Sequence, residues 1–247
     1  MSGRVTGIWR HPIKSHGREA LERVTLSAGQ TLPWDRVWAI AHENSDADGS
    51  QWLPCAHFSR VSKAPQLMAV TATLDEATET ITLRHPARPD LTFSPDRDQL
   101  AFLDWVRPLM PEDRAQSARI VRARQRGMTD SDFASVTLCN MSSHRAVEQK
   151  LGQTLSIQRW RGNIWMDGLA PWAEFDWLGH EVQIGSTIFK IRERTDRCAA
   201  TTTNPDTGQR DADTLNVLQS WGHQDFSVRA EVVRTGEIAL GDTVRLL

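Results

Sequence analysis

Short runs in which apolar and polar residues alternate dominate the first 90 positions. These runs are rich in Val, Ile, Thr and Trp, a composition typical of half-buried strands. They cover residues 4–10, 23–29, 36–42, 67–75 and 80–85. Because no helical stripe interrupts them, the pattern predicts a small β-barrel or curled sheet. The polar stretch 42–52, which carries Asp and Gly, predicts a loop.

A helix is predicted to begin at residues 94–96, Ser-Pro-Asp, which combine a cap, a proline at the first helical position and an acid in the first turn. Apolar side chains then share one face at helical spacing: Leu100, Leu103, Val106 and Met110. Pro111 marks the expected end. This helix is the predicted seam between two domains, residues 1–95 and residues 96–247.

The second half is predicted to be β-rich with a few helices. Strand patterns occur at 117–123 and 134–140, in a hairpin at 180–193 that turns at Gly185-Ser186, and around the Gly turns of 226–247. Helical patterns occur at 142–152 and 211–221. The expected fold class is therefore mostly β with a few helices (α+β).

Composition excludes several classes of protein. The formal net charge of −2 argues against a protein whose main task is to bind nucleic acid. No run approaches the ~18 apolar residues of a membrane span, and the N-terminus has no apolar signal core. We therefore expect a soluble, cytoplasmic protein with no membrane and no nucleic-acid partner.

The cysteine and histidine spacings exclude several metal sites. The three cysteines, Cys55, Cys139 and Cys198, include no C-x-x-C pair, which excludes a disulfide scaffold, a four-cysteine zinc site and an iron–sulfur cluster made by this chain alone. The eight histidines include no H-x-x-x-H spacing, which excludes a zincin. Cys55 and Cys139 are predicted to be inert packing residues.

Five arginines fall within 13 residues: Arg114, Arg119, Arg122, Arg124 and Arg126. They predict either an anion or nucleic-acid patch or a solvated strand edge that resists aggregation. The strand edge is the favoured interpretation.

Two segments carry polar groups suited to an anionic or planar ligand. Lys14 and Ser15 directly follow a predicted strand and suit a phosphate or another anionic oxygen group. Arg161 and Asn163 are two residues apart, so in an extended segment they point the same way and offer donors and an acceptor to a planar ligand. Each pair is also compatible with an ordinary exposed strand end or edge.

A third segment, residues 194–208, carries a candidate reactive thiol. Cys198 has Arg194 and Arg197 as cationic neighbours in sequence, and it lies between a predicted strand and an Asn-Pro-Asp-Thr-Gly turn. A thiolate there serves as a nucleophile, a persulfide carrier or a ligand of a soft metal. The residues alone leave these three open.

Five motifs in this order resemble the MOSC family with its N-terminal β-barrel domain. They are residues 11–15 (His-Pro-Ile-Lys-Ser), 34–38 (Trp-Asp-Arg-Val-Trp), 160–164 (Trp-Arg-Gly-Asn-Ile), 197–208 and 241–244 (Gly-Asp-Thr-Val). The resemblance implies an N-terminal β-barrel-like domain at 1–95 and a MOSC β-barrel domain at 96–247. The family includes the mitochondrial amidoxime-reducing component and bacterial reductases, which bind molybdenum with one pterin.

The resemblance assigns roles to individual residues. Cys198 inherits the role of molybdenum ligand and catalytic centre. Seven residues inherit contacts with molybdopterin or its phosphate: Lys14, Ser15, Arg36, Ser142, Arg161, Asn163 and Arg197. A phosphate at a helix N-terminus near arginines fits such a site. Pyridoxal phosphate is a second ligand that the resemblance allows.

The sequence also departs from the family pattern. His11 stands where relatives have Tyr and Trp160 where they have Phe, and the loop 42–60 has Gln-Trp-Leu-Pro-Cys at 51–55 in place of a Thr-Gln-Arg arrangement. Since the sequence ends at Leu247 with no cysteine-rich ferredoxin segment, electrons are expected from a separate protein.

The resemblance implies a molybdenum-cofactor oxidoreductase that reduces N-oxygenated small molecules such as hydroxylamines or amidoximes. Two alternatives remain open at this point. One is a sulfur-carrying or cofactor-handling protein with a persulfide on Cys198, and the other is a molybdopterin-binding module without chemistry.

Overall fold

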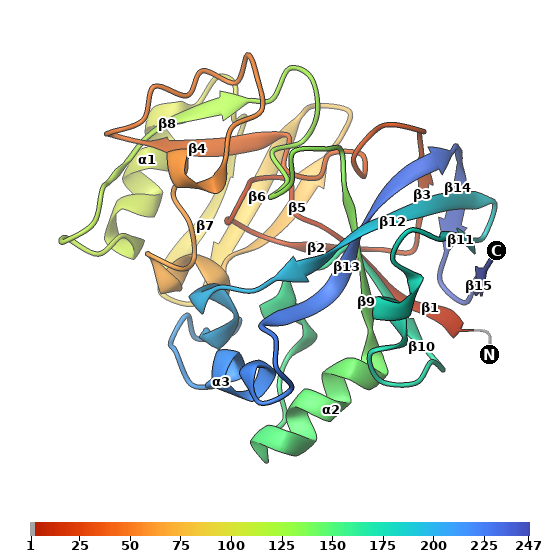
Figure 1. Ribbon diagram of the computed structural model, residues 1–247. Coiled ribbons are helices and arrows are strands. Elements are labelled where there is room, and N and C mark those ends of the chain that lie inside the picture. The colour runs from red at the N-terminus through yellow and green to blue at the C-terminus, as the bar shows by residue number, and fades with distance from the viewer. Residues whose placement is uncertain (1–2) are drawn as a thin grey trace.

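A closed β-barrel forms one half of the computed structural model, which describes residues 3–247 (Figure 1). Its strands pair in the order β10-β9-β13-β12-β11-β15-β1, and β1 closes the barrel against β10. Among the barrel strands in the described part of the chain, only the neighbours β9 and β10 run parallel. The barrel strands are β1 (Gly3–Arg10), β9 (Val136–Asn140), β10 (Ile164–Asp167), β11 (Glu181–Ile184), β12 (Thr187–Asp196), β13 (Asp225–Arg234) and β15 (Thr243–Leu246). Strand β1 therefore belongs to a barrel whose other strands all come from the second half of the chain.

Alternating side chains fill the barrel. Along β12, Thr187, Phe189 and Ile191 are buried while their neighbours are partly exposed. Val228 and Ala230 of β13 face the same core. Burial of a Phe or Ile side chain stabilises a fold by about 1.5–3 kcal/mol, so the period-two pattern determines which face of each strand points inward.

The other half, which we call the N-terminal lobe, packs on a second apolar core. Its sheets are β5-β6-β7 and the pair β4–β8. The helix α1 covers them (Figure 1). The elements of the lobe are β4 (Trp38–His42), β5 (Thr71–Asp75), β6 (Thr80–His85), β7 (Arg88–Phe93), α1 (Gln99–Val106) and β8 (Ser117–Arg122). The predicted fold class, mostly β with a few helices, is confirmed.

The remaining elements connect or cover these two halves. Strand β2 pairs with β1, and β3 pairs with β14. Helices α2 and α3 pack beside the barrel around a third apolar cluster (Figure 1). Their bounds are β2 (Glu19–Leu21), β3 (Arg23–Leu26), β14 (Gly236–Ala239), α2 (Met141–Leu151) and α3 (Thr214–Gln219). Among residues 3–247, no helix is long and apolar enough to cross a membrane.

The predicted start of the first helix was wrong, and so was one residue of its predicted apolar face. Helix α1 begins at Gln99, because Ser94 and Asp98 form a closed turn in which the Asp98 carboxylate accepts from Ser94 N (2.8 Å) and Asp98 N donates to Ser94 O (2.8 Å). Val106 and Met110 are buried as predicted. Leu100 is 76% exposed, and the helix buries Phe102 and Trp105 in its place. Burial of two large aromatic side chains removes more apolar surface from water than burial of Leu100 would.

The fold itself uses most of the clustered arginines. Arg119 donates to the carbonyl oxygens of Ser45 (2.5 Å) and Ala47 (2.9 Å). Arg122 pairs with Glu79 and Asp96, both at 2.5 Å. Arg126 donates to the carbonyl oxygens of Ser131 (2.9 Å) and Phe133 (2.7 Å). These guanidinium groups hold loops in place, which favours a structural role over an anion-binding patch.

Candidate functional site

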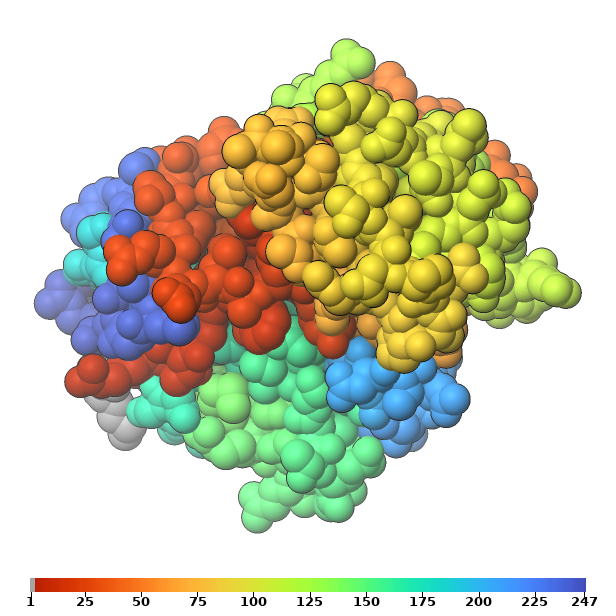
Figure 2. All heavy atoms as spheres, turned by 180° about the vertical axis from the view of Figure 1, so that it is seen from behind, coloured from red at the N-terminus to blue at the C-terminus, as the bar shows by residue number. Residues whose placement is uncertain are grey.

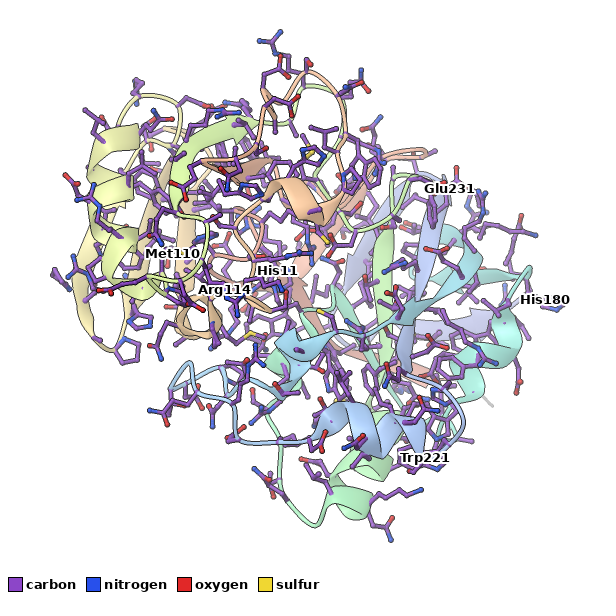
Figure 3. All side chains as sticks on the ribbon, turned by 60° about the vertical axis from the view of Figure 1, so that its left-hand side comes forward. His11, Met110, Arg114, His180, Trp221 and Glu231 are labelled. Atoms are coloured by element: carbon purple, nitrogen blue, oxygen red, sulfur yellow. The ribbon has the colours of Figure 1, made fainter. Side chains whose placement is uncertain are left out.

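A cavity of about 290 Å³ lies where the N-terminal lobe meets the barrel. Figure 3 shows His11 between the two halves, with Arg114 on the lobe and Glu231 on the barrel. Segments far apart in sequence line the cavity: residues 14–15, 36, 55–62, 129–137, 159–161, 195–201 and 229. Six of the eight predicted site residues are among them: Lys14, Ser15, Arg36, Arg161, Arg197 and Cys198.

Three of these residues have a backbone conformation that side chains rarely adopt. Ser15, Arg36 and Arg161 have φ angles of 65°, 57° and 49°. A non-glycine residue in this region costs about 1–3 kcal/mol, and such residues cluster at functional sites. The fold enforces the strain at Arg36, whose N–H donates to the His11 carbonyl (2.7 Å). The strained backbone directs these three residues to one cavity.

A buried ion pair supports this wall. Asp35 accepts a hydrogen bond from His11 N (2.7 Å) and contacts the Arg36 guanidinium. Burial alone raises the pKa of Asp35, but the charge of Arg36 and the hydrogen bonds from His11 outweigh it and hold the pKa well below its usual range. Asp35 is therefore a buried carboxylate that fixes Arg36 beside the cavity.

Two fully buried histidines make the stability of the fold depend on pH. Burial lowers the pKa of His16 to about 4 and, with the charges of Arg161 and Arg36, that of His11 to about 3. Both histidines take up a proton near ~6.5 in the unfolded chain, so protonation favours unfolding below that pH. The free energy of unfolding is expected to fall by about 1.4 kcal/mol per histidine for each pH unit between ~6.5 and ~4.

Urea denaturation at pH 7.5 and pH 5.5 measures this effect. His16→Asn provides the control, because Asn keeps a donor for the Lys14 carbonyl, 2.8 Å from Nδ1 of His16, and does not titrate. We expect this variant to show a smaller pH dependence than the wild-type protein. Equal stability of the wild-type protein at the two pH values would contradict the assignment.

Positive charge dominates the lining of the cavity. The lining includes seven cationic side chains and only two carboxylates, those of Asp130 and Asp196. Both carboxylates are already paired, since Asp130 contacts Lys14 and Asp196 accepts from Arg229 (2.8 Å). The cations are Lys14, Arg36, Arg60, Arg159, Arg161, Arg197 and Arg229. The cavity thus has an excess of positive charge that suits an anionic ligand.

Arg161 has a spare donor for an anionic ligand. Its Nη1 is buried and has no hydrogen-bond partner among residues 3–247. Burial, together with the charges of Arg36 and Arg18, lowers the pKa of Arg161 to about 9. Arg36 Nη2 donates to the Arg161 carbonyl (3.0 Å), which ties the two cations together. An oxyanion at Arg161 would satisfy this donor and offset the mutual repulsion.

Arg197 has a different role, because its donors are used within the protein. It donates to the carbonyls of Trp160 (2.8 Å) and Phe226 (2.7 Å) and to the Ser227 hydroxyl (2.6 Å). Burial lowers the pKa of Arg197 to about 10. Arg197, which directly precedes Cys198, therefore anchors this part of the chain to the wall that carries Trp160.

Cys198 is the exposed thiol of the cavity. It follows the end of β12 and precedes the short 3₁₀ helix Ala199–Thr202. Cys139 is buried, as predicted, and burial raises the pKa of its thiol to about 12. The prediction that Cys55 only packs was wrong: Cys55 is half-buried, lines the cavity, and its Sγ accepts from Arg60 Nη1 (3.2 Å).

The structure places two predicted site residues outside the cavity lining. Asn163 joins strands, because its Oδ1 accepts from Thr137 N (3.1 Å) and its Nδ2 donates to the Trp9 carbonyl (3.1 Å). Ser142 lies in the first turn of α2, where its hydroxyl accepts from Arg145 (2.9 Å). Asn163 thus holds the segment after Arg161 in place rather than facing the cavity.

Gly162 has no room for a side chain. A Cβ at this position would lie 2.2 Å from the Cys139 Sγ, inside the buried cluster beside the barrel. We expect Gly162→Ala to destabilise the fold by about 1–3 kcal/mol through overpacking, measured by chemical denaturation. The double variant with Cys139→Ala should recover most of the loss, and no loss in the single variant would contradict this packing.

Sequence reasoning missed several lining residues. Arg60 lies in a segment where no motif marks it, and Arg229 lies in an ordinary strand pattern. Arg159 directly precedes the motif at 160–164, but it occupies a short 3₁₀ helix, Ile157–Trp160, that the pattern did not reveal. Only the fold brings these arginines to one cavity.

Two family models match this chain. The MOSC N-terminal beta barrel domain matches residues 2–138 and the MOSC domain matches residues 125–245. The first match alone covers more than half of the chain. The chain belongs to the MOSC family. Membership confirms the family indicated by the sequence motifs. The two matches of this MOSC protein overlap at 125–138, and the domain boundary after residue 95 stays a prediction.

Individual relatives are more distant. This MOSC protein is 29% identical over 126 residues to mitochondrial amidoxime-reducing component 1 from Xenopus laevis, a match that covers 46% of this chain and 36% of that relative. The chain thus matches about a third of the length of its curated relative. Among solved structures, it is similar to the YUAD protein from Bacillus subtilis (TM-score 0.45, 11% identity, 99% and 94% of the two chains) and to YiiM from Geobacillus stearothermophilus (TM-score 0.35, 16% identity, 45% and 53%).

Proposed function

We propose that this protein is a molybdenum-cofactor oxidoreductase that reduces N-oxygenated small molecules with electrons from a separate protein. The observation that carries the proposal is the cavity itself, where the exposed thiol of Cys198 lines the same space as Arg161, whose buried Nη1 has no hydrogen-bond partner among residues 3–247. Membership of the MOSC family and the similarity to an amidoxime-reducing component support it.

The residues present fit an anionic cofactor with a soft metal. Thiolate is the form in which cysteine binds a metal, and Cys198 offers the accessible thiol. Arg161 and Arg36 would hold the phosphate through charge-assisted hydrogen bonds, with Lys14 and Ser15 beside them. When bound, the cofactor supplies two-electron chemistry that protein side chains lack.

The overall reaction takes two electrons and two protons for each N–O bond broken. A hydroxylamine R–NHOH becomes the amine R–NH₂ and water, so the N–O bond breaks and an N–H bond forms. The chain contributes binding and exclusion of water. Trp160 lines the cavity and stacks on Phe226 with ring centroids 3.8 Å apart, which gives the site one rigid apolar wall.

A second candidate function is sulfur transfer through a persulfide on Cys198. The exposure of this thiol next to Arg197 favours it. The test makes two measurements on one preparation. Benzamidoxime reduction is assayed with a chemical reductant, and a persulfide on Cys198 is detected by mass spectrometry. Reduction without persulfide supports the reductase, whereas a persulfide on Cys198 without reduction contradicts it and favours sulfur transfer.

A further inference from the structure

Arg159 is a buried arginine that the proposed cofactor site leaves unexplained. Its side chain is 2% exposed and lines the cavity. Nη2 donates to Asp211 Oδ1 (2.5 Å), whereas Nε and Nη1 are buried and have no hydrogen-bond partner among residues 3–247. Unsatisfied buried donors are costly and rare in folded proteins, so these two nitrogens indicate a missing acceptor.

Arg60 is a second cation of the same cavity with spare donors. Its Nη1 donates to the Cys55 Sγ (3.2 Å), a weak acceptor. No carboxylate pairs with Arg60 among the residues that the structure describes. Arg60 is half-buried, so its guanidinium borders the cavity and remains reachable by a small ligand.

The loop 203–211 joins the walls that carry Arg60 and Arg159. Asp211 binds Arg159, and the adjacent Arg210 donates to the Ser62 carbonyl (2.8 Å). Gln66 of the lobe also donates to the Gly208 carbonyl (3.2 Å). Figure 2 shows the part of the chain near residue 205 lying against the N-terminal lobe. Adjacent residues of one loop therefore bind Arg159 and the segment that follows Arg60.

A different set of contacts holds the cofactor-binding cations. Arg36 is tied to the Arg161 carbonyl, and Lys14 is tied to the Met128 carbonyl (2.6 Å) and Asp130. Two sets of contacts thus hold cations of the cavity. One set holds Lys14, Arg36 and Arg161. The other set, made by the loop 203–211, holds Arg159 and the segment that follows Arg60.

We infer that Arg60 and Arg159 form an anion subsite that binds a carboxylate on the substrate. The inference rests on the proposed function and names its substrate class as small N-hydroxylated molecules that also carry a carboxylate. Guanidinium groups bind carboxylates through paired, charge-assisted hydrogen bonds.

The binding test uses benzoate and benzamide, which have nearly the same shape and differ in charge. Calorimetry on the cofactor-loaded protein is expected to give at least about tenfold tighter binding of benzoate, the size of one charge-assisted hydrogen bond. Arg60→Gln and Arg159→Gln should each weaken benzoate binding about tenfold. Arg60→Lys should retain part of it, and Arg107→Gln, at an exposed position on the lobe, should retain all of it.

Equal binding of benzoate and benzamide to the wild-type protein would overturn the subsite. Undiminished benzoate binding in Arg60→Gln would overturn it as well. The Arg60 variant keeps the test valid if Arg159→Gln fails to fold, because Arg60 is half-buried and forms no ion pair with a carboxylate among residues 3–247.

Kinetics separate this inference from the proposed function. The ratio of kcat/KM for 4-carboxybenzamidoxime over benzamidoxime is expected to exceed about ten and to fall about tenfold in Arg60→Gln. A ratio near one with both compounds reduced would overturn the subsite and leave the reductase intact. Reduction of neither compound would overturn the reductase, while benzoate binding would still test the subsite.

Discussion

Cys198→Ala is expected to lower the rate of benzamidoxime reduction by about 10³-fold or more, the range seen when a group essential to the reacting centre is removed. The loss follows because Cys198 is the accessible thiol of the cavity and the proposed metal ligand. Its side chain is exposed, so the free energy of unfolding should change by less than about 0.5 kcal/mol. Steady-state assays and urea denaturation of the same preparation measure both quantities.

Cys55→Ala is the matched control, because Cys55 lines the same cavity but lacks a motif role. We expect this variant to retain its metal. Full activity of Cys198→Ala would disprove the assignment of Cys198 as the metal ligand. A large loss of stability would indicate that the activity loss reports on folding instead.

Arg161→Asn is expected to lower the pterin content of the purified protein at least about tenfold, the effect of losing one charge-assisted hydrogen bond. Asn tolerates the left-handed backbone at position 161, so the variant removes the charge without changing the turn. Cofactor-free protein should become more stable by about 1 kcal/mol, because a buried cation near Arg36 and Arg18 is removed.

Two variants complete this experiment. Arg161→Lys keeps the charge and should retain part of the pterin. Arg114→Asn removes an exposed arginine of the lobe that lies beside Asp113 and is not part of the cavity lining, and it should change neither quantity. Wild-type pterin content in Arg161→Asn would contradict the role of Arg161, as would a loss of stability in the cofactor-free variant.

The sequence predicted the fold class well because strand periodicity is a local property. Alternating residues in β12 and β13 face inward as their pattern indicates. The closure of the barrel was not predictable in this way. Strand β1 pairs with β10, where Ile8 lies opposite Ile164, and no local pattern connects two segments so distant in the chain.

The candidate site was predictable only where motifs mark it. Lys14, Arg36 and Cys198 lie in recognisable motifs and line the cavity. Asn163 also lies in a motif, yet its side chain binds two backbone groups. A polar residue in such a motif can hold the backbone of the site in place without lining the cavity. Arg159 has no motif, and its importance follows from burial and unpartnered donors, which only a structure reveals.

The most direct test of the central claim is metal analysis combined with pterin fluorescence on protein purified from a host that makes the molybdenum cofactor. We expect about one molybdenum and one pterin per wild-type chain, and loss of molybdenum from Cys198→Ala. Wild-type protein that contains neither molybdenum nor pterin would contradict the proposed cofactor site.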